Sequence, residues 1–219
     1  MNQIQRTLAI FAISVSPLFL AVSCSKITAK DFYEQGLSQA DMGNYQGAVK
    51  AYTRAIAKNN QGAELYNDRG YANSEMGNYQ TAIADYDRAL ELNPDFAEAY
   101  YNRGVARYKL LDDEGALEDY TKALELNPNY LQAYGNRAFI RMQLGDRKGA
   151  IEDFNHVILY YPELAPLYYN RGLALFQMGD RQAGMRDLHK AVKLFSEQNN
   201  SEGRKQVMDA IDQLQRIQF

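Results

Sequence analysis

The side chains that most often carry out chemistry are few in this sequence. Its 219 residues include two histidines, His156 and His189, and one cysteine, Cys24. We find no Cys/His spacing typical of a metal site, no phosphate-binding glycine loop and no nucleophile elbow, and the carboxylates are dispersed. The sequence therefore predicts a protein that is not an enzyme and that needs no metal or cofactor.

Cys24 follows an apolar segment at the start of the chain. Residues 1–7 are polar with one basic side chain, and Leu8 to Val22 form a 15-residue apolar stretch. A membrane-spanning helix needs about 20 apolar residues, whereas the h-region of a signal peptide is shorter. Residues 1–23 are therefore predicted to be a signal peptide and are set apart from the fold.

The residues that end this segment, Ala21-Val22-Ser23-Cys24, resemble the lipobox of bacterial lipoproteins, although the commonest lipobox has leucine where Ala21 stands. The resemblance implies cleavage before Cys24, acyl chains such as palmitate on that cysteine, and a durable membrane anchor, because several chains hold better than one. Residues 24–28 would form a short tether. By the same analogy Ser25 favours the outer membrane, if the organism has one. We expect an extracytoplasmic protein of the bacterial cell envelope. The alternatives are an ordinary secretory signal ahead of an incidental cysteine, and an uncleaved anchor.

Composition and charge narrow the class of protein further. Apolar residues make up 46% of the chain and charged residues 23%, which is typical of a globular domain. There are 24 basic and 27 acidic side chains, so the net charge is -3 and no basic excess is present to attract nucleic acid. We therefore expect a folded chain without a nucleic-acid partner.

A period of 34 residues runs through most of the chain. Tyrosine recurs at this spacing from Tyr66 to Tyr168, and Phe32 precedes the series. Two series of small residues follow the same period: Gly36, Gly70, Gly104, Ala138, Gly172, and Ala48, Ala82, Ala116, Ala150, Gly184. Pro94, Pro128 and Pro162 end the inner units. The period divides residues 29–198 into five units, whose places we number from 1 to 34: 29–62, 63–96, 97–130, 131–164 and 165–198.

This pattern resembles the tetratricopeptide repeat (TPR). In each unit a break such as Met76-Gly77-Asn78 separates two apolar stripes, so the unit is predicted to form two helices joined by a turn. Small residues at places 8 and 20 let these helices approach, and an aromatic ring fills the volume. The resemblance implies an all-α fold, a right-handed α-α superhelix of five TPR units. Residues 199–219 are predicted to form a capping helix, with a partner-binding helix as the alternative.

Two departures from the family pattern indicate a polar seam. Place 7, usually leucine, is arginine in units two to five, and place 11, usually tyrosine, is polar or basic in four units. Aspartate stands at place 23 in the same units that have the arginine at place 7, whereas unit one has Gln35 and Ala51 instead. This joint presence predicts pairing, within a unit or between neighbours: Arg69/Asp85, Arg103/Asp119, Arg137/Asp153 and Arg171/Asp187.

In the family, the first helix of each unit lines a concave groove through places 2, 5, 6, 9, 12 and 13. Carried over to this chain, these places imply the following groove residues: Tyr33, Glu34, Glu64, Asp68, Tyr71, Glu98, Tyr101, Asn102, Tyr108, Asn136, Phe139, Met142, Tyr169, Asn170 and Phe176. A side-chain amide can donate to and accept from a peptide backbone. The asparagines at place 6 are therefore expected either to hold a partner's backbone or, alternatively, to make local contacts.

The predicted function is that of a scaffold that binds a peptide or helix of another protein, as a membrane-anchored lipoprotein assisting assembly of an envelope complex. The N-terminal half of the groove is acidic and the C-terminal half apolar, so the partner segment is expected to be basic at one end and apolar at the other. The alternative is a self-associating adaptor, a homo-oligomer without a peptide ligand.

One class of TPR ligand is not expected. Co-chaperone TPR domains that clamp a C-terminal carboxylate carry Lys at place 5 and Asn at place 9; this chain has Tyr, Asn or Gly at place 5 and apolar residues at place 9. We therefore expect no such clamp.

Overall fold

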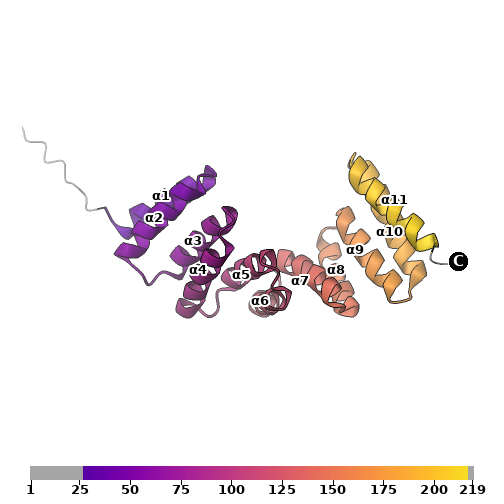
Figure 1. The fold of residues 1–219 in the computed structure, drawn as a ribbon, viewed down its shortest axis with the longest axis horizontal. Helices are drawn as coiled ribbons and strands as arrows, with labels where there is room; N and C mark the ends of the chain where they lie inside the picture. The colour runs from indigo at the N-terminus through magenta and orange to yellow at the C-terminus, as the bar shows by residue number, and fades with distance from the viewer. Residues whose placement is uncertain (1–26, 217–219) are drawn as a thin grey trace, which may run out of the picture.

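The computed structural model describes residues 27–216, and every regular element within them is an α-helix (Figure 1). The helices are α1 (Ala29–Asp41), α2 (Tyr45–Lys58), α3 (Ala63–Glu75), α4 (Tyr79–Leu92), α5 (Ala97–Lys109), α6 (Asp113–Leu126), α7 (Leu131–Leu144), α8 (Arg147–Tyr160), α9 (Ala165–Gln177), α10 (Arg181–Glu197) and α11 (Ser201–Arg216). Each predicted unit contains two helices, and α11 follows the fifth unit. The predicted all-α repeat fold is confirmed. The predicted signal peptide, Cys24 and residues 217–219 lie outside the described residues.

The helices form a single curved row. Each first helix packs against the second helix of its own unit, and each second helix packs against the first helix of the next unit. The first helices of neighbouring units also touch, α3 with α5 and α7 with α9, so these helices crowd toward the inner side of the curve. Figure 1 shows the two ends of the row rising to the same side, with α5 inside the curve and α6 outside it. The first helices therefore line the concave face.

Small residues hold the two helices of each unit close together. A Cβ added to Gly104 of α5 would lie 2.8 Å from a ring carbon of Tyr120 on α6. The Tyr120 side chain is 1% exposed and fills the space that the glycine leaves. Gly36 faces Tyr52 and Gly70 faces Tyr86 in the same way. The prediction that an aromatic ring fills the volume beside the small residue at place 8 is confirmed: the ring, at place 24, enters the crossing because the opposite helix has no side chain there.

The turn inside each unit needs one residue with left-handed backbone. Glycine occupies it in four units, with φ of 72° at Gly43, 79° at Gly77, 86° at Gly145 and 94° at Gly179. Unit three has Leu111 there instead, at φ 63°, and its side chain is 87% exposed. A leucine in this conformation is strained, because its Cβ crowds the carbonyl oxygen.

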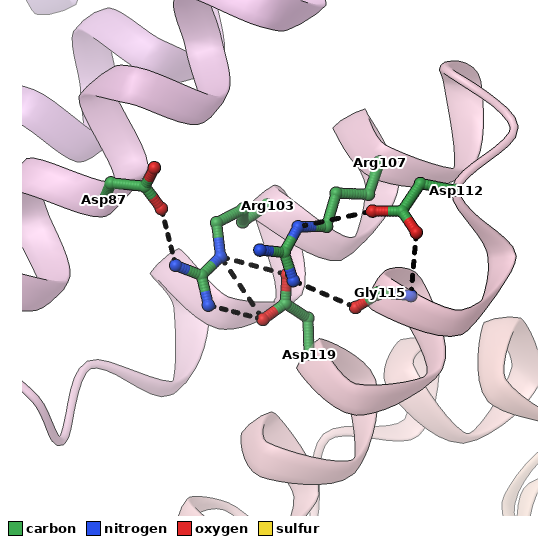
Figure 2. A network of polar contacts seen from close by, with 6 residues as sticks. All are labelled: Asp87, Arg103, Arg107, Asp112, Gly115 and Asp119. Atoms are coloured by element: carbon green, nitrogen blue, oxygen red, sulfur yellow. Dashed lines mark hydrogen bonds and ion pairs between the residues drawn. The ribbon is translucent and has the colours of Figure 1, made fainter.

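The polar seam is a set of buried ion pairs between the two helices of a unit (Figure 2). In unit three Arg103 donates from Nε to Asp119 Oδ2 at 3.0 Å and from Nη2 to Asp119 Oδ1 at 2.6 Å. Arg107 adds a third contact, from Nη1 to Asp119 Oδ2 at 3.0 Å. The Asp119 side chain is 3% exposed. Burial raises the pKa of the Asp119 carboxyl, and the two guanidinium groups beside it oppose that rise.

The same pairing occurs in units two, four and five, so the prediction of pairing within a unit is confirmed. The shortest N–O distances are 2.5 Å for Arg69/Asp85, 2.8 Å for Arg137/Asp153 and 2.7 Å for Arg171/Asp187. Each arginine also reaches the preceding unit through Nη1, where it meets place 25: Thr53, Asp87, Thr121 or Asn155. The seam therefore ties neighbouring units to one another as well as the two helices of each unit.

Helix α11 closes the C-terminal end of the row. Its buried residues Val207 and Ile211 join the core cluster that includes Leu194 and Phe195 of α10. A solenoid needs such a helix because its last unit would otherwise expose an apolar face. This is the capping role predicted from the sequence. No helix within residues 27–216 is long and apolar enough to cross a membrane.

Candidate partner-binding groove

The candidate groove residues lie on the first helices α1, α3, α5, α7 and α9, along the whole concave face. A hydrogen bond links place 5 of one unit to place 6 of the next at three successive interfaces. Tyr33 donates from Oη to Asp68 Oδ2 at 2.8 Å. Asn102 donates from Nδ2 to Asn67 Oδ1 at 3.1 Å. Asn136 donates from Nδ2 to Tyr101 Oη at 3.3 Å. We call these three bonds the inter-unit ladder.

The ladder settles the role of two asparagines that the sequence left open. One amide proton of Asn102 and one of Asn136 are used between units, so both side chains help to hold the scaffold together. Asn67, which the sequence analysis did not place in the groove, is 1% exposed and accepts the bond from Asn102. The sequence does contain a sign of this role: Asn67 has an amide at place 5, where units one and three have Tyr33 and Tyr101.

The N-terminal half of the groove carries three carboxylates around Asn67. The Asn67 Nδ2 atom lies 3.2 Å from Asp68 Oδ1 and 3.5 Å from Glu98 Oε1. Burial raises the pKa of Asp68, hydrogen bonds from Tyr33 and Asn67 oppose the rise, and the charges of Glu98 and Glu64 add to it. Glu64 and Glu98 are exposed, whereas Asp68 is half-buried. The exposed pair is therefore available to a basic partner, and Asp68 acts mainly within the scaffold.

Glu34 of α1 adds a further exposed carboxylate at the start of the groove. Its Oε1 lies 3.7 Å from Lys30 Nζ, and both side chains are largely solvent-accessible. An ion pair of this kind is weak, because water screens it. Glu34 can therefore exchange Lys30 for a partner's basic group.

The middle of the groove contains an apolar hollow, which we call the Phe139 pocket. It measures about 320 Å³ and lies between α5, α6 and α7. Its lining includes Tyr101, Val105, Tyr108, Asn136, Phe139 and Ile140. Phe139 is 41% exposed, and its ring meets that of Tyr108 edge-on with centroids 6.0 Å apart. Tyr101 is held from below by Tyr130, whose ring centroid lies 4.7 Å away. An exposed aromatic ring on a firmly supported concave wall is suited to bind an apolar side chain.

The remaining predicted residues differ in how far they face the groove. Tyr71 is 44% exposed and packs edge-on against Tyr45. Met142 packs against the core cluster of Phe154, and Tyr169 packs against the cluster of the last unit. Phe176 lies beneath the guanidinium of Arg181, 5.7 Å from its ring centroid, and Asn170 is half-buried. The predicted residues therefore form one continuous face but not one compact site.

Within residues 27–216 no three His, Cys, Asp or Glu side chains gather in a way that could hold a metal ion. His156 lies between Tyr134 and Tyr160, with ring centroids 4.1 Å and 5.7 Å away.

Comparison with protein-family models identifies the repeats directly. Models described as TPR repeat or tetratricopeptide repeat match residues 33–74, 74–110, 97–130, 131–164 and 165–198. No curated protein matches the chain. The last three matches have the same boundaries as the units read from the 34-residue period.

Solved structures share this architecture. The crystal structure of MamA protein is 24% identical, with a TM-score of 0.70 over 80% of this chain and 95% of that one. YrrB, described as a TPR protein with an unusual peptide-binding site, is 20% identical, with a TM-score of 0.72 over 83% of this chain and 92% of that one. The first TPR of Spaghetti (RPAP3), bound to the HSP90 peptide SRMEEVD, is 30% identical, with a TM-score of 0.53 over 54% of this chain and 94% of that one. In all, 455 solved chains match, so the likeness identifies a widely used fold and no particular partner.

Proposed function

Because the chain belongs to the tetratricopeptide-repeat family, we propose that it is a scaffold that binds a peptide or helix of another protein along its concave face. The observation that carries this proposal is the Phe139 pocket. It combines the exposed ring of Phe139 with a largely apolar lining that includes Val105 and Ile140. Peptides bound by related folds, such as the HSP90 peptide on Spaghetti, support a role of this kind.

The chemistry of the groove describes the partner segment. Exposed carboxylates of Glu34, Glu64 and Glu98 lie at the N-terminal end, and the Phe139 pocket lies further along. The segment should therefore be basic at one end and aromatic or aliphatic at the other. Apolar anchors supply most of the affinity at such interfaces, whereas charges at the rim mainly raise the association rate. The carboxylate clamp needs Lys at place 5 and Asn at place 9, and no unit of this chain has either residue at that place. A C-terminal HSP90-type peptide is therefore not the expected ligand.

The groove is tested by comparing two exposed apolar residues. Partners are captured from membranes with the full chain, and the bound segment is mapped and synthesised. Phe139→Ala should speed dissociation of that segment by about tenfold or more, because it removes a wall of the pocket. Leu159→Ala is the matched control, since Leu159 is 79% exposed and lies on the second helix α8. Glu64→Lys should slow association and weaken its dependence on salt. A mapped segment that contacts only second helices, or binding unchanged by both groove variants, would contradict the proposal.

We propose further that the protein is a lipid-anchored member of the bacterial cell envelope that assists assembly of an envelope complex. The support is the lipobox-like sequence at Cys24, which lies outside the described residues. Helix α1 begins at Ala29 behind a capping box of Thr28 and Asp31. The few residues between Cys24 and that helix span at most about 17 Å, so an anchored chain would hold unit one close to the membrane surface.

The anchor is tested by labelling. Wild-type protein should incorporate labelled palmitate and partition into detergent, and Cys24→Ala should do neither. An unlabelled wild type would contradict the anchor while leaving the groove proposal intact.

In the self-association alternative the convex face or the capping helix builds an oligomer, and an exposed apolar patch on the last helix would favour it. Among the large apolar side chains described on α11, only Met208 is exposed, at 47%. The groove is the better-supported binding surface.

A further inference from the structure

Gly135, in the middle of α7, lacks both the left-handed backbone of the turn glycines and the close contacts of the other helical glycines within residues 27–216. Four of those glycines adopt left-handed backbone in turns. At every other helical glycine within residues 27–216, an added Cβ would come within 3.0 Å of a neighbouring atom. At Gly135 an added Cβ would meet nothing within 4 Å. A glycine inside a helix destabilises it relative to alanine, so neither packing nor backbone geometry accounts for its presence here.

The missing side chain interrupts the inter-unit ladder. Place 5 is Tyr33, Asn67 and Tyr101 in the first three units, and each of these side chains bonds to place 6 of the next unit. Gly135 occupies place 5 of unit four, so the fourth rung cannot form. Asn170, at place 6 of unit five, has no side chain to meet at that place, and its amide remains available to another molecule.

A cavity of about 370 Å³ opens at this interruption, and we call it the Gly135 pocket. Its lining includes Leu131, Gln132, Asn136, Tyr161, Leu164 and Leu167. None of the residues that line it is charged. Asn170 is not part of this lining, but it follows Leu167 by about one turn on the same face of α9 and is therefore its neighbour beyond the pocket.

A second departure from the repeat occurs in the wall of the same pocket. Place 31 is asparagine in units one to three, and the side chain of Asn59, Asn93 or Asn127 accepts a hydrogen bond at 3.1 Å from the backbone N–H two residues later. Units four and five have aromatic residues at this place instead, Tyr161 and Phe195; Phe195 is buried, whereas Tyr161 is 41% exposed and puts its ring in the wall of the pocket. Two local rules are therefore broken around one cavity, which is typical of a functional site.

We propose that the Gly135 pocket is the anchor subsite of the groove and receives one large apolar side chain, aromatic or leucine, from an extended peptide of a partner protein. This proposal rests on the proposed function and names its subsite. The amides of Gln132 and Asn136 line the pocket, that of Asn170 lies one turn beyond Leu167, and all three suit a peptide backbone. An extended segment fits better than a helix, because the backbone groups of a helix are already bonded to one another.

Charge indicates how the rest of the peptide lies. Tyr101 lines the pocket and stacks on Tyr130, and the nearby charge of Glu98 contributes, after burial, to a raised pKa of Tyr130. Glu98 is exposed, and its Oε1 also lies 3.5 Å from Asn67 Nδ2, so it stands between Tyr130 beside the Gly135 pocket and the acidic end of the groove. A basic residue of the same peptide should follow its apolar anchor in that direction.

The test uses a library of displayed twelve-residue peptides selected on the purified full chain. Enriched peptides are synthesised, labelled and measured by fluorescence anisotropy. They should share a large apolar residue next to a basic one. Gly135→Tyr copies the residue found at place 5 in three other units, so it should fold while filling the pocket, and it should weaken binding at least about tenfold. Gly135→Ala is the matched control and should bind within about twofold of wild type. Asn170→Ala should weaken binding about fivefold without lowering the thermal midpoint.

The outcomes separate this inference from the proposed function. Peptides that bind Gly135→Tyr as tightly as wild type but fail to bind Phe139→Ala would overturn the Gly135 assignment and leave the groove proposal standing. Enriched peptides that bind Gly135→Tyr and Phe139→Ala as tightly as wild type would overturn both the subsite and the groove proposal. Equal losses with Gly135→Ala and Gly135→Tyr would also refute the subsite, because alanine leaves the cavity open.

Discussion

The buried pair of Arg103 and Asp119 allows the sharpest test of how the scaffold is held together. Asp119→Ala leaves two guanidinium groups, those of Arg103 and Arg107, without their shared carboxylate. Removing one partner of a buried ion pair typically costs about 3 to 5 kcal/mol. Arg103 keeps a contact with Asp87 of the preceding unit, at 2.6 Å, and its own side chain is 16% exposed. We therefore expect a loss near the lower end of that range, about 3 kcal/mol.

Removal of the arginine should cost less than removal of the aspartate. After Arg103→Ala, the Asp119 carboxylate still accepts from Arg107 Nη1 at 3.0 Å, so it is not left unpaired. We expect a loss of about 2 kcal/mol for this variant. The double variant should lose less than the two single losses combined, which corresponds to a coupling energy of about 1.5 kcal/mol.

The measurement is urea unfolding of the four proteins followed by helical circular dichroism. Because a repeat array unfolds as coupled neighbouring units, the curves are fitted with a nearest-neighbour description in which unit three carries the change. The exposed pair Arg88/Glu91, with side chains 40% and 63% exposed, is the control and should show a coupling of about 0.5 kcal/mol or less. Additive losses for Arg103 and Asp119, or an Asp119→Ala loss below about 1 kcal/mol, would refute the assignment of the seam as a buried stabilising network.

Three further substitutions test single features of the fold. Leu111→Gly should raise the free energy of unfolding by about 0.5 to 1 kcal/mol, because it removes a leucine from left-handed backbone; an unchanged or lower urea midpoint would contradict the strain. Gly104→Ala should destabilise by about 1 to 3 kcal/mol, since the new Cβ would press on the Tyr120 ring, and a neutral result would show that the ring can move aside. Asp68→Asn should stabilise the protein at neutral pH, because the pKa of Asp68 is raised in the folded state and the charged form is therefore disfavoured there. That gain should shrink as the pH falls through the raised pKa, and a gain independent of pH in thermal melts would contradict this cause.

Much of this architecture is readable from the sequence because a repeat protein makes the same short-range contacts in every unit. Gly104 and Tyr120 lie 16 residues apart, and so do Arg103 and Asp119, so both contacts recur with the 34-residue period, and the arginine and aspartate are present or absent together. The absence of both Arg and Asp from unit one was enough to predict the pairing that the structure shows. The two helices of each unit followed from the same period, and in the turn between them only unit three, with Leu111, has a residue other than glycine at the left-handed position.

Other features depend on how one unit sits on the next. The bonds of Asn102 to Asn67 and of Asn136 to Tyr101 join places 5 and 6 of different units, and the family pattern assigns both places to the groove without saying that they meet. The sequence shows a glycine at place 5 of unit four, but it does not show that this glycine removes a rung and opens a cavity walled by Tyr161. Sequence by itself determined the units, because each is held by contacts within one helix pair. Only the tertiary structure decided which groove residues are used by the scaffold and which remain free to bind, because that depends on the curvature that brings successive first helices together.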